Sequence, residues 1–98
     1  MMEELLKYCT EHEKVSCYGA GLYGRNTAMF LLNKGIDVDG FIVSEADRYT
    51  AVLGKSVRSI VDARESISGQ GIIVCVGINS FNDVSLKLNE YGIRDFFR

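Results

Sequence analysis

The chain alternates short apolar runs with longer stretches that are apolar on one side only. The runs predict β-strands, and the one-sided stretches, with apolar residues three or four positions apart, predict α-helices. The expected strands cover residues 14–18, 37–43, 56–60, 71–77 and 93–97. The expected helices cover residues 3–13, 22–34, 61–68 and 81–91, and a polar connector covers residues 44–56. The unbroken run GIIVCVG at 71–77 is typical of a strand buried on both faces.

Two serines are expected to begin helices. Ser59 stands three residues before Asp62, and Ser80 stands three before Asp83, which is the spacing of a capping box. In such a box the serine hydroxyl accepts a hydrogen bond from a backbone N–H of the first turn. We therefore expect Ser59 to cap the helix at 61–68 and Ser80 to cap the helix that follows it.

The order of these elements predicts the fold class. Strands that alternate with helices form a mostly parallel sheet with helices on both faces. Right-handed crossovers favour the strand order 3-2-1-4-5. We therefore expect an α/β protein, a Rossmann-like three-layer sandwich with a mostly parallel five-stranded sheet. A length of 98 residues fits one domain over residues 1–98.

Composition and charge limit the partners. The net charge is −2 and no lysine or arginine cluster stands out, so we expect no nucleic-acid partner. No apolar run is long enough to span a bilayer. The start, MMEELLKYCTEHEK, has acidic residues where a signal peptide has a basic region, so we expect a cytoplasmic location.

Cysteine and histidine residues are few. Cys9, Cys17 and Cys75 have no CxxC spacing, and the single histidine, His12, lies in a charged stretch expected to be exposed. We therefore expect no disulfide framework, no metal site and no catalytic triad. The predicted strand order makes the strands of Cys17 and Cys75 neighbours. Two small core residues are the favoured interpretation of this pair, and a redox pair is the alternative.

The segment CYGAGLYGR carries the clearest candidate chemistry. Gly19, Gly21 and Gly24 fit the pattern G-x-G-x-x-G between an apolar strand and an amphipathic helix. In a phosphate-binding turn the first glycine permits the bend, the second lets a phosphate approach the backbone, and the third lets the helix pack on the strand. The N–H groups at the helix start then attract an anion. The alternative is a tight turn without a ligand.

Two further segments are expected at the same edge of the sheet. Dinucleotide folds place an acid at the end of the second strand to bind ribose hydroxyls. Here that end is Ser44-Glu45, because Asp39 comes too early. The fourth strand ends in Gly77-Ile78-Asn79, which we expect to face the glycine turn across a crevice.

Several roles stay open at this level. Arg25 reaches a phosphate or faces solvent, Tyr23 flanks a ligand or covers the turn, and Asn79 binds a base or sugar or caps a helix. No acid/base group accompanies the glycines, so we expect no catalytic residue. The expected nucleotide-binding residues are Gly19, Ala20, Gly21, Leu22, Tyr23, Gly24, Arg25, Ser44, Glu45, Gly77, Ile78 and Asn79.

The segments VSCYGAGLYGRNTAMFLLNKGIDVDGFIVSE, LGKSV and GIIVCVGIN give the chain a family resemblance. It resembles the N-terminal Rossmann-like domain of bacterial sugar O- and N-acyltransferases of the bacillosamine-pathway type. It is also similar to the nucleotide-binding domain of nucleotide-sugar dehydratases and epimerases, and to modules attached to glycosyltransferases and methyltransferases. The resemblance implies a bound UDP-sugar, with the three glycines on the diphosphate and residues 77–79 on the opposite wall. It also implies a separate catalytic domain in a larger parent enzyme of surface-polysaccharide biosynthesis.

Three functions follow as expectations. The first is a nucleotide- or nucleotide-sugar-binding module without catalytic machinery of its own. The second is the NAD(P)-binding part of an oxidoreductase, although no tyrosine has a lysine four residues later, as a Tyr-x-x-x-Lys pair requires. The third is an interaction domain without a ligand. Phe97-Arg98 directly after a strand indicates a domain cut from a longer chain.

Overall fold

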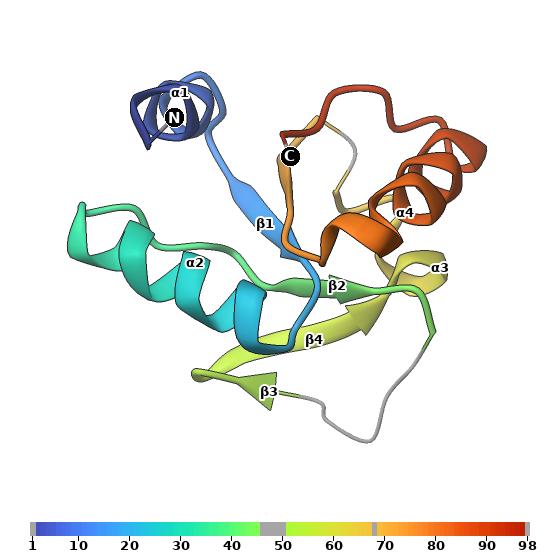
Figure 1. Cartoon of the computed structure of the whole chain (residues 1–98), viewed down its shortest axis with the longest axis horizontal. Helices are drawn as coiled ribbons and strands as arrows, with labels where there is room; N and C mark the ends of the chain where they lie inside the picture. Colours follow the sequence, from blue (N-terminus) through green and yellow to red (C-terminus); the bar gives the residue numbers. More distant parts are fainter. Residues whose placement is uncertain (1, 46–50, 68, 98) are drawn as a thin grey trace.

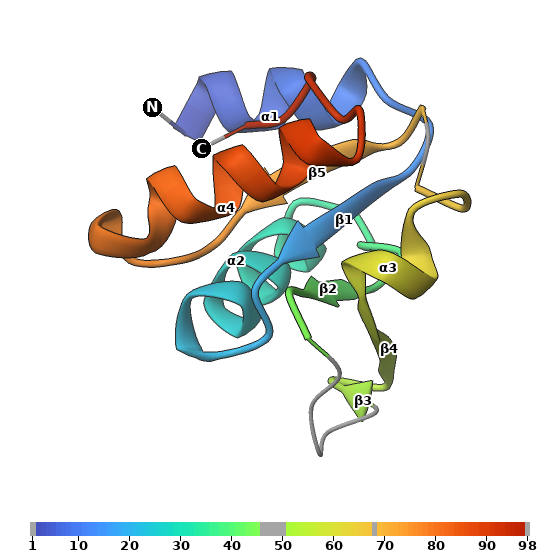
Figure 2. The ribbon, with the colours of Figure 1, turned by 90° about the vertical axis from the view of Figure 1, so that its right-hand side faces the viewer.

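A computed structural model describes residues 2–45, 51–67 and 69–97 of the chain. Helices and strands alternate along most of this length (Figure 1). The elements are α1 (Met2–Thr10), β1 (Val15–Tyr18), α2 (Leu22–Asn33), β2 (Phe41–Val43), β3 (Ala51–Val52), β4 (Lys55–Ser59), α3 (Ile60–Ala63), β5 (Gly71–Val74) and α4 (Ile78–Glu90). The C-terminal segment returns beside α1, so the first and last parts of the chain are neighbours (Figure 2).

The strands form one five-stranded sheet in the order β3-β4-β2-β1-β5. β1 pairs in parallel with β2 on one side and β5 on the other, and β2 pairs in parallel with β4. Only β3 is antiparallel, to β4. The expected α/β class with a mostly parallel five-stranded sheet is therefore confirmed.

The predicted strand order 3-2-1-4-5 is wrong. Ala51–Val52, inside the expected connector, pairs with β4 and takes one edge of the sheet. Leu53 and Gly54 join the two strands with φ angles of 52° and 74°, the left-handed backbone that a two-residue hairpin turn requires. At the other edge, the expected strand 93–97 contributes only an isolated bridge between Phe97 and Ile73. The middle of the expected connector, residues 46–50, lies outside the described residues.

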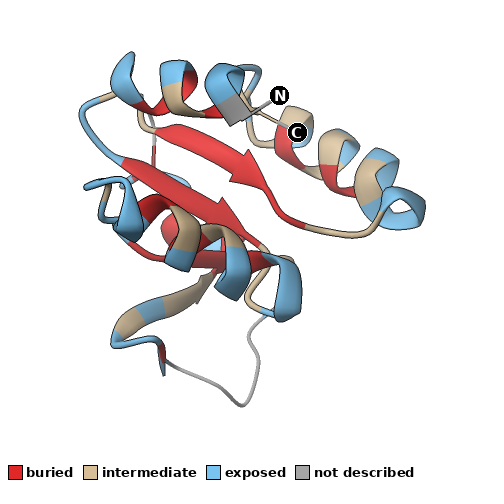
Figure 3. Ribbon diagram, turned by 60° about the vertical axis from the view of Figure 1, so that its left-hand side comes forward, coloured by how far each residue is buried: buried red, intermediate tan, exposed pale blue. Residues whose placement is uncertain are grey.

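Helices cover both faces of the sheet, and each face has its own core (Figure 3). Alternate side chains of a strand point to opposite faces, so Cys17 of β1 faces α1 and α2, and Tyr18 faces α3 and α4. The first core gathers Leu5, Tyr8, Cys9, Val15, Cys17, Ala28, Leu31, Val38, Phe41, Val52, Ile73 and Cys75. The second gathers Tyr18, Ile42, Ile60, Ala63, Ile67, Ile72, Val74, Val84 and Leu88.

The two expected serine caps have different outcomes. Ser59 caps α3, since its hydroxyl accepts a hydrogen bond of 3.2 Å from the backbone N–H of Asp62. The Ser80 prediction is wrong, because α4 begins at Ile78 with Gly77 as its N-cap. Ser80 already lies in the first turn, where its N–H donates to the Gly77 carbonyl at 2.9 Å.

Two expected element boundaries and one expected exposure also differ from the structure. α3 ends at Ala63 instead of continuing to residue 68, which itself lies outside the described part of the chain. β2 is shorter than the expected strand 37–43, although Asp39 N–H already donates to the Val15 carbonyl at 2.7 Å. His12, expected to be exposed, is half-buried against Tyr8, their ring centroids 4.4 Å apart.

Two leucines of α4 test the second core. Leu88 is fully buried, whereas Leu86, two residues earlier on the same helix, is 64% exposed. We expect Leu88→Ala to lower the free energy of unfolding by about 2–5 kcal/mol, because it removes buried methyl groups and leaves a cavity. Leu86→Ala should change it by less than about 0.5 kcal/mol. Urea unfolding of the two variants measures both values, and equal losses would contradict the assignment of this core.

Candidate functional site

The glycine turn begins where β1 ends. Gly19 has a φ of +113°, which side chains rarely tolerate, and its N–H donates to the Ile42 carbonyl at 2.7 Å. A Cβ at this position would lie 2.6 Å from the carbonyl oxygen of Cys75. Both the backbone angle and the close approach of the next strand therefore require glycine at position 19.

Gly24 is required for a different reason. It is buried in α2, and a Cβ there would overlap the Gly19 carbonyl oxygen and lie 3.5 Å from the Phe41 ring. The helix consequently rests directly on the turn that precedes it. This is the close helix–strand packing expected for the third glycine of the pattern.

Gly21 has no such structural requirement. It is the N-cap of α2 with φ −84° and ψ −151°, an extended conformation open to any residue. A Cβ at Gly21 would have nothing within 4 Å. The space beside this residue is therefore open, and neither backbone strain nor packing among the described residues accounts for the missing side chain.

The structure brings the end of β5 to the turn. A Cβ on Gly19 would be 3.2 Å from Cγ1 of Val76, and one on Gly77 would be 3.9 Å from the Tyr23 ring. Residues 19–24 and Gly77 thus lie beside each other at the carboxyl ends of β1 and β5, where the crevice is expected. Asn79 is exposed in the first turn of α4, and Ile78 is 90% exposed on the rim.

Two helices begin at this edge of the sheet. α2 starts after Gly21 and α4 starts after Gly77, and neither N-cap makes a side-chain hydrogen bond. The first turn of each helix also lacks an acidic residue. Helix N-termini carry a partial positive charge and unpaired N–H donors. No carboxylate of the first turns compensates this partial charge at either helix start.

The second strand places its candidates on the other side of β1. Ser44 directly follows β2, and its hydroxyl is 2.7 Å from the hydroxyl of the buried Tyr18. Burial raises the pKa of Tyr18, so this phenol stays neutral. Glu45 is exposed one residue further on. The Glu45 side chain is therefore open to solvent, whereas the Ser44 hydroxyl already has the Tyr18 hydroxyl as a hydrogen-bond partner.

The remaining candidates surround the turn. Ala20 is half-buried and packs against the first core. Leu22 and Tyr23 are 70% and 61% exposed at the start of α2. Arg25 is exposed, and its backbone N–H donates to the Gly21 carbonyl at 3.0 Å. The first turn of α2 thus carries the exposed side chains of Leu22, Tyr23 and Arg25, next to the open space at the N-cap Gly21.

An apolar groove continues from the Gly77 wall. It has a volume of about 460 Å³ and is lined by Val74, Val76, Ile78, Phe81 and Asn82. Val76 and Ile78 flank Gly77 in the chain, so this groove adjoins the crevice. Its position beside the start of α4 gave no signal in the sequence, because it depends on how the helix meets β5.

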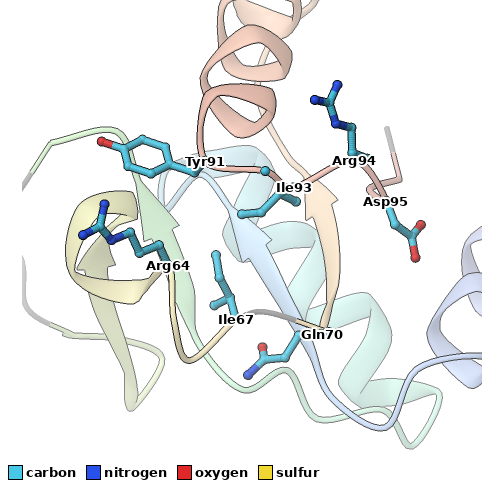
Figure 4. Close-up of a pocket in the computed structure, with 9 residues that line it drawn as sticks. Arg64, Ile67, Gln70, Tyr91, Ile93, Arg94 and Asp95 are labelled. Atoms are coloured by element: carbon cyan, nitrogen blue, oxygen red, sulfur yellow. The ribbon is translucent and has the colours of Figure 1, made fainter.

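Another hollow, of about 300 Å³, lies at the amino end of β5, away from the glycine turn (Figure 4). Several of its polar side chains are engaged with neighbours, and the Arg94 side chain also lines it. Gln70 bonds through both ends of its amide, to Ser16 and to the Ser66 carbonyl, and the Arg64 guanidinium lies 5.9 Å from the centre of the Tyr91 ring. Ile67 and Ile93 line it between these groups (Figure 4). None of the nucleotide-binding residues predicted from the sequence lines this hollow.

Cys17 and Cys75 lie together beneath the turn, as their predicted strand order implied. Both are free and buried in the first core, which confirms that they are core residues. The Cys75 thiol donates to the Ile73 carbonyl at 3.4 Å. The hydrogen bond with Cys75, together with burial, raises the pKa of the Cys17 thiol. The hydrogen bond from Cys17 instead lowers the pKa of the Cys75 thiol, against the opposing effect of burial. Burial therefore shields both sulfurs, whereas only Cys17 is held in the protonated form.

Among residues 2–45, 51–67 and 69–97, no group of three or more His, Cys, Asp or Glu side chains is placed to hold a metal ion. Within the same residues, no helix has the length and apolar character needed to cross a membrane.

A search against protein-family models finds no match, and a search of curated proteins finds no similar sequence. The family resemblance of the motifs therefore stays a prediction.

Two glycine substitutions test the packing of the turn. Gly24→Ala should lower the free energy of unfolding by more than about 2 kcal/mol, because the new Cβ overlaps the Gly19 carbonyl. Gly21→Ala, the matched control, should cost less than about 1 kcal/mol, because its Cβ meets open space. Chemical denaturation compares the two, and a larger loss for Gly21→Ala would contradict this geometry.

The buried thiols make a further prediction. A thiol reagent such as dithionitrobenzoate should label neither Cys17 nor Cys75 in the native protein, since both are buried. Both should react after denaturation. Mass spectrometry of the labelled peptides identifies the sites. Rapid labelling of either cysteine under native conditions would favour the redox alternative instead.

Proposed function

We propose that this chain is a Rossmann-like module that binds a nucleotide or nucleotide-sugar, with the diphosphate over Gly21. The observation that carries the proposal is the open space at this glycine. Packing explains Gly19 and Gly24, but it does not explain why position 21 lacks a side chain. A phosphate that approaches the backbone there would need the same space, which makes a ligand the simplest reason for glycine.

The charge around the crevice supports an anionic ligand. The N-termini of α2 and α4 meet there with no side-chain cap and no acid in their first turns. Backbone N–H groups at such ends bind phosphate oxygens. The exposed Arg25 guanidinium, on the first turn of α2, adds a mobile positive charge. These donors fit two linked phosphates better than a single neutral group.

The rest of the ligand has two places to lie beside the diphosphate. On the β2 side, Glu45 is exposed and offers a carboxylate to ribose hydroxyls. On the β5 side, the apolar groove of about 460 Å³ offers van der Waals contact and the amide of Asn82. Together with the motif resemblance, these features favour a UDP-sugar, presented to a catalytic domain of a larger parent enzyme. We propose that this parent modifies cell-surface sugars.

NAD(P) is the second candidate, and the exposed Glu45 is the observation that favours it. The carboxylate stands two residues beyond the end of β2, near the position from which an acid binds the adenosine ribose. An NAD(P)-binding role would make the chain part of an oxidoreductase. The two candidates differ in base and sugar but share the diphosphate.

A ligand screen by thermal unfolding tests the proposal. UDP, UDP-N-acetylglucosamine, CDP, ATP, NAD and NADP are each added to the intact chain. A ligand at a hundred times its Kd stabilises a protein by about 2.7 kcal/mol, which raises the Tm of a domain of this size by roughly 10–20 °C. We expect a shift with UDP compounds, whereas a shift with NAD or NADP alone would favour the second candidate. No shift with any of them would overturn the proposal and favour an interaction domain.

A substitution at position 21 locates the site. Gly21→Val should abolish the shift while the fold survives, because its branched side chain fills the open space that the phosphates need. Met29→Val is the matched control, since Met29 is 54% exposed further along the same helix. Isothermal titration of both variants measures Kd. Unchanged affinity in Gly21→Val would contradict the assignment of the diphosphate to this turn.

A further inference from the structure

His12 lies between two hydrogen-bond acceptors. Its Nδ1 is 2.8 Å from the Tyr8 carbonyl oxygen, and its Nε2 is 2.8 Å from Oδ2 of Asp95. A carbonyl and a carboxylate oxygen only accept hydrogen bonds, and a neutral imidazole has only one N–H to donate. Both contacts are therefore satisfied at once only when the ring carries two protons and a positive charge.

The residues that His12 joins are far apart in the sequence. Tyr8 belongs to α1, whereas Asp95 belongs to the segment that follows α4. The Tyr8 hydroxyl adds a second link, since it donates to the Asp95 carbonyl at 3.3 Å and accepts from the Ile72 N–H at 2.9 Å. His12, Tyr8 and Asp95 thus connect the first helix, the last segment and β5.

This connection covers the outer edge of β5. The Phe97 N–H donates to the Ile72 carbonyl at 2.7 Å, and the Val74 N–H donates to the Phe97 carbonyl at the same distance. The Phe97 ring packs on the Tyr8 ring with centroids 5.5 Å apart. Asp95, two residues before Phe97, therefore anchors the short stretch that pairs with this edge.

We propose that His12 is a proton-operated latch, which holds the segment around Asp95 and Phe97 on the edge of β5 when protonated and releases it when neutral. Loss of the proton leaves His12 able to donate to only one of its two acceptors. The released edge then exposes the Val74 N–H and Ile72 carbonyl to water or to another strand, as an uncovered sheet edge does. This device is separate from the proposed nucleotide site.

The charged groups that act on His12 favour its protonated ring, whereas its partial burial opposes the charge. The acids that act on it are Asp95 on the last segment and Glu11 directly after α1. Tyr8 on α1 stays neutral, because burial raises its pKa to about 12. On the β5 side the neighbour is Gly71, which has no charge. The hydrogen bonds to the Tyr8 carbonyl and to Asp95 raise the pKa of His12 above its usual 6.5.

The sign of the pH effect follows from that direction. A group whose pKa is higher in the folded than in the unfolded protein stabilises the fold fully below its unfolded pKa. The contribution is lost as the pH rises through the folded pKa. The latch should therefore be closed below about pH 6.5 and open progressively above it.

Hydrogen exchange on the intact chain tests the latch. As the pH rises through the His12 titration, the protection factors of the Val74 and Phe97 amides should fall roughly three- to tenfold, the loss of one hydrogen bond of ordinary strength at this exposed pair. In His12→Gln they should show no such step. Asp37→Asn is the matched control, because Asp37 forms the exposed ion pair with Lys55, at 2.8 Å, and should leave the step unchanged.

Proton NMR supplies an independent readout, because His12 is the only histidine and its ring signals are unambiguous once any affinity tag is removed. The midpoint of its titration should lie above pH 6.5, and it should be lower in Asp95→Asn. The Asp95→Asn variant also replaces His12→Gln as the test if His12→Gln does not fold. A midpoint at or below 6.5, or identical pH dependence with and without His12, would overturn the latch. Neither measurement involves a nucleotide, so a result that overturns the latch is distinct from a result that overturns the proposed function.

Discussion

The contact between the Gly24 backbone and the Gly19 carbonyl fixes the geometry on which the rest of the molecule depends. No side chain fits between these residues, and the Cys75 carbonyl closes on Gly19 from the neighbouring strand. Three backbones consequently meet at one point: the end of β1, the first turn of α2 and the residues after β5. This contact fixes the direction in which α2 leaves the sheet. The N-terminus of α2 therefore lies beside the open space at Gly21.

The same constraint explains why the crevice is lined by backbone and apolar groups. Positions 19 and 24 admit no side chain, position 21 carries none, and Gly77 opposite them lies near the Tyr23 ring. Polarity at this edge therefore comes from the N–H groups of two helix starts, without acids in the first turns to neutralise them. A site of this kind binds through its shape and its dipoles. In the proposed function, this edge holds a phosphate group through the backbone N–H groups of the two helix starts.

The sequence predicted those features that arise from local spacing. The run at 71–77 predicted a buried strand, the three glycines predicted a strand–turn–helix unit, and Ser59 predicted a cap, because each depends on residues within a few positions. The hairpin at β3 was missed, since Leu53 is an unusual residue for a positive φ and gave no turn signal. The Ser80 prediction failed because α4 takes its first turn from Gly77, ahead of the capping pattern.

The contacts of His12 and of β5 had no local signal at all. His12 and Asp95 are 83 positions apart, and only the folded sheet brings α1 beside the last segment. β5 takes part in both proposed features, but through opposite edges. Its inner edge pairs with β1 at four positions, from Val15 with Gly71 to Tyr18 with Val74, and this pairing holds the walls of the crevice. Its outer edge carries the latch. The two edges use different backbone hydrogen bonds of β5, so the release proposed for the outer edge breaks none of the bonds that pair β5 with β1.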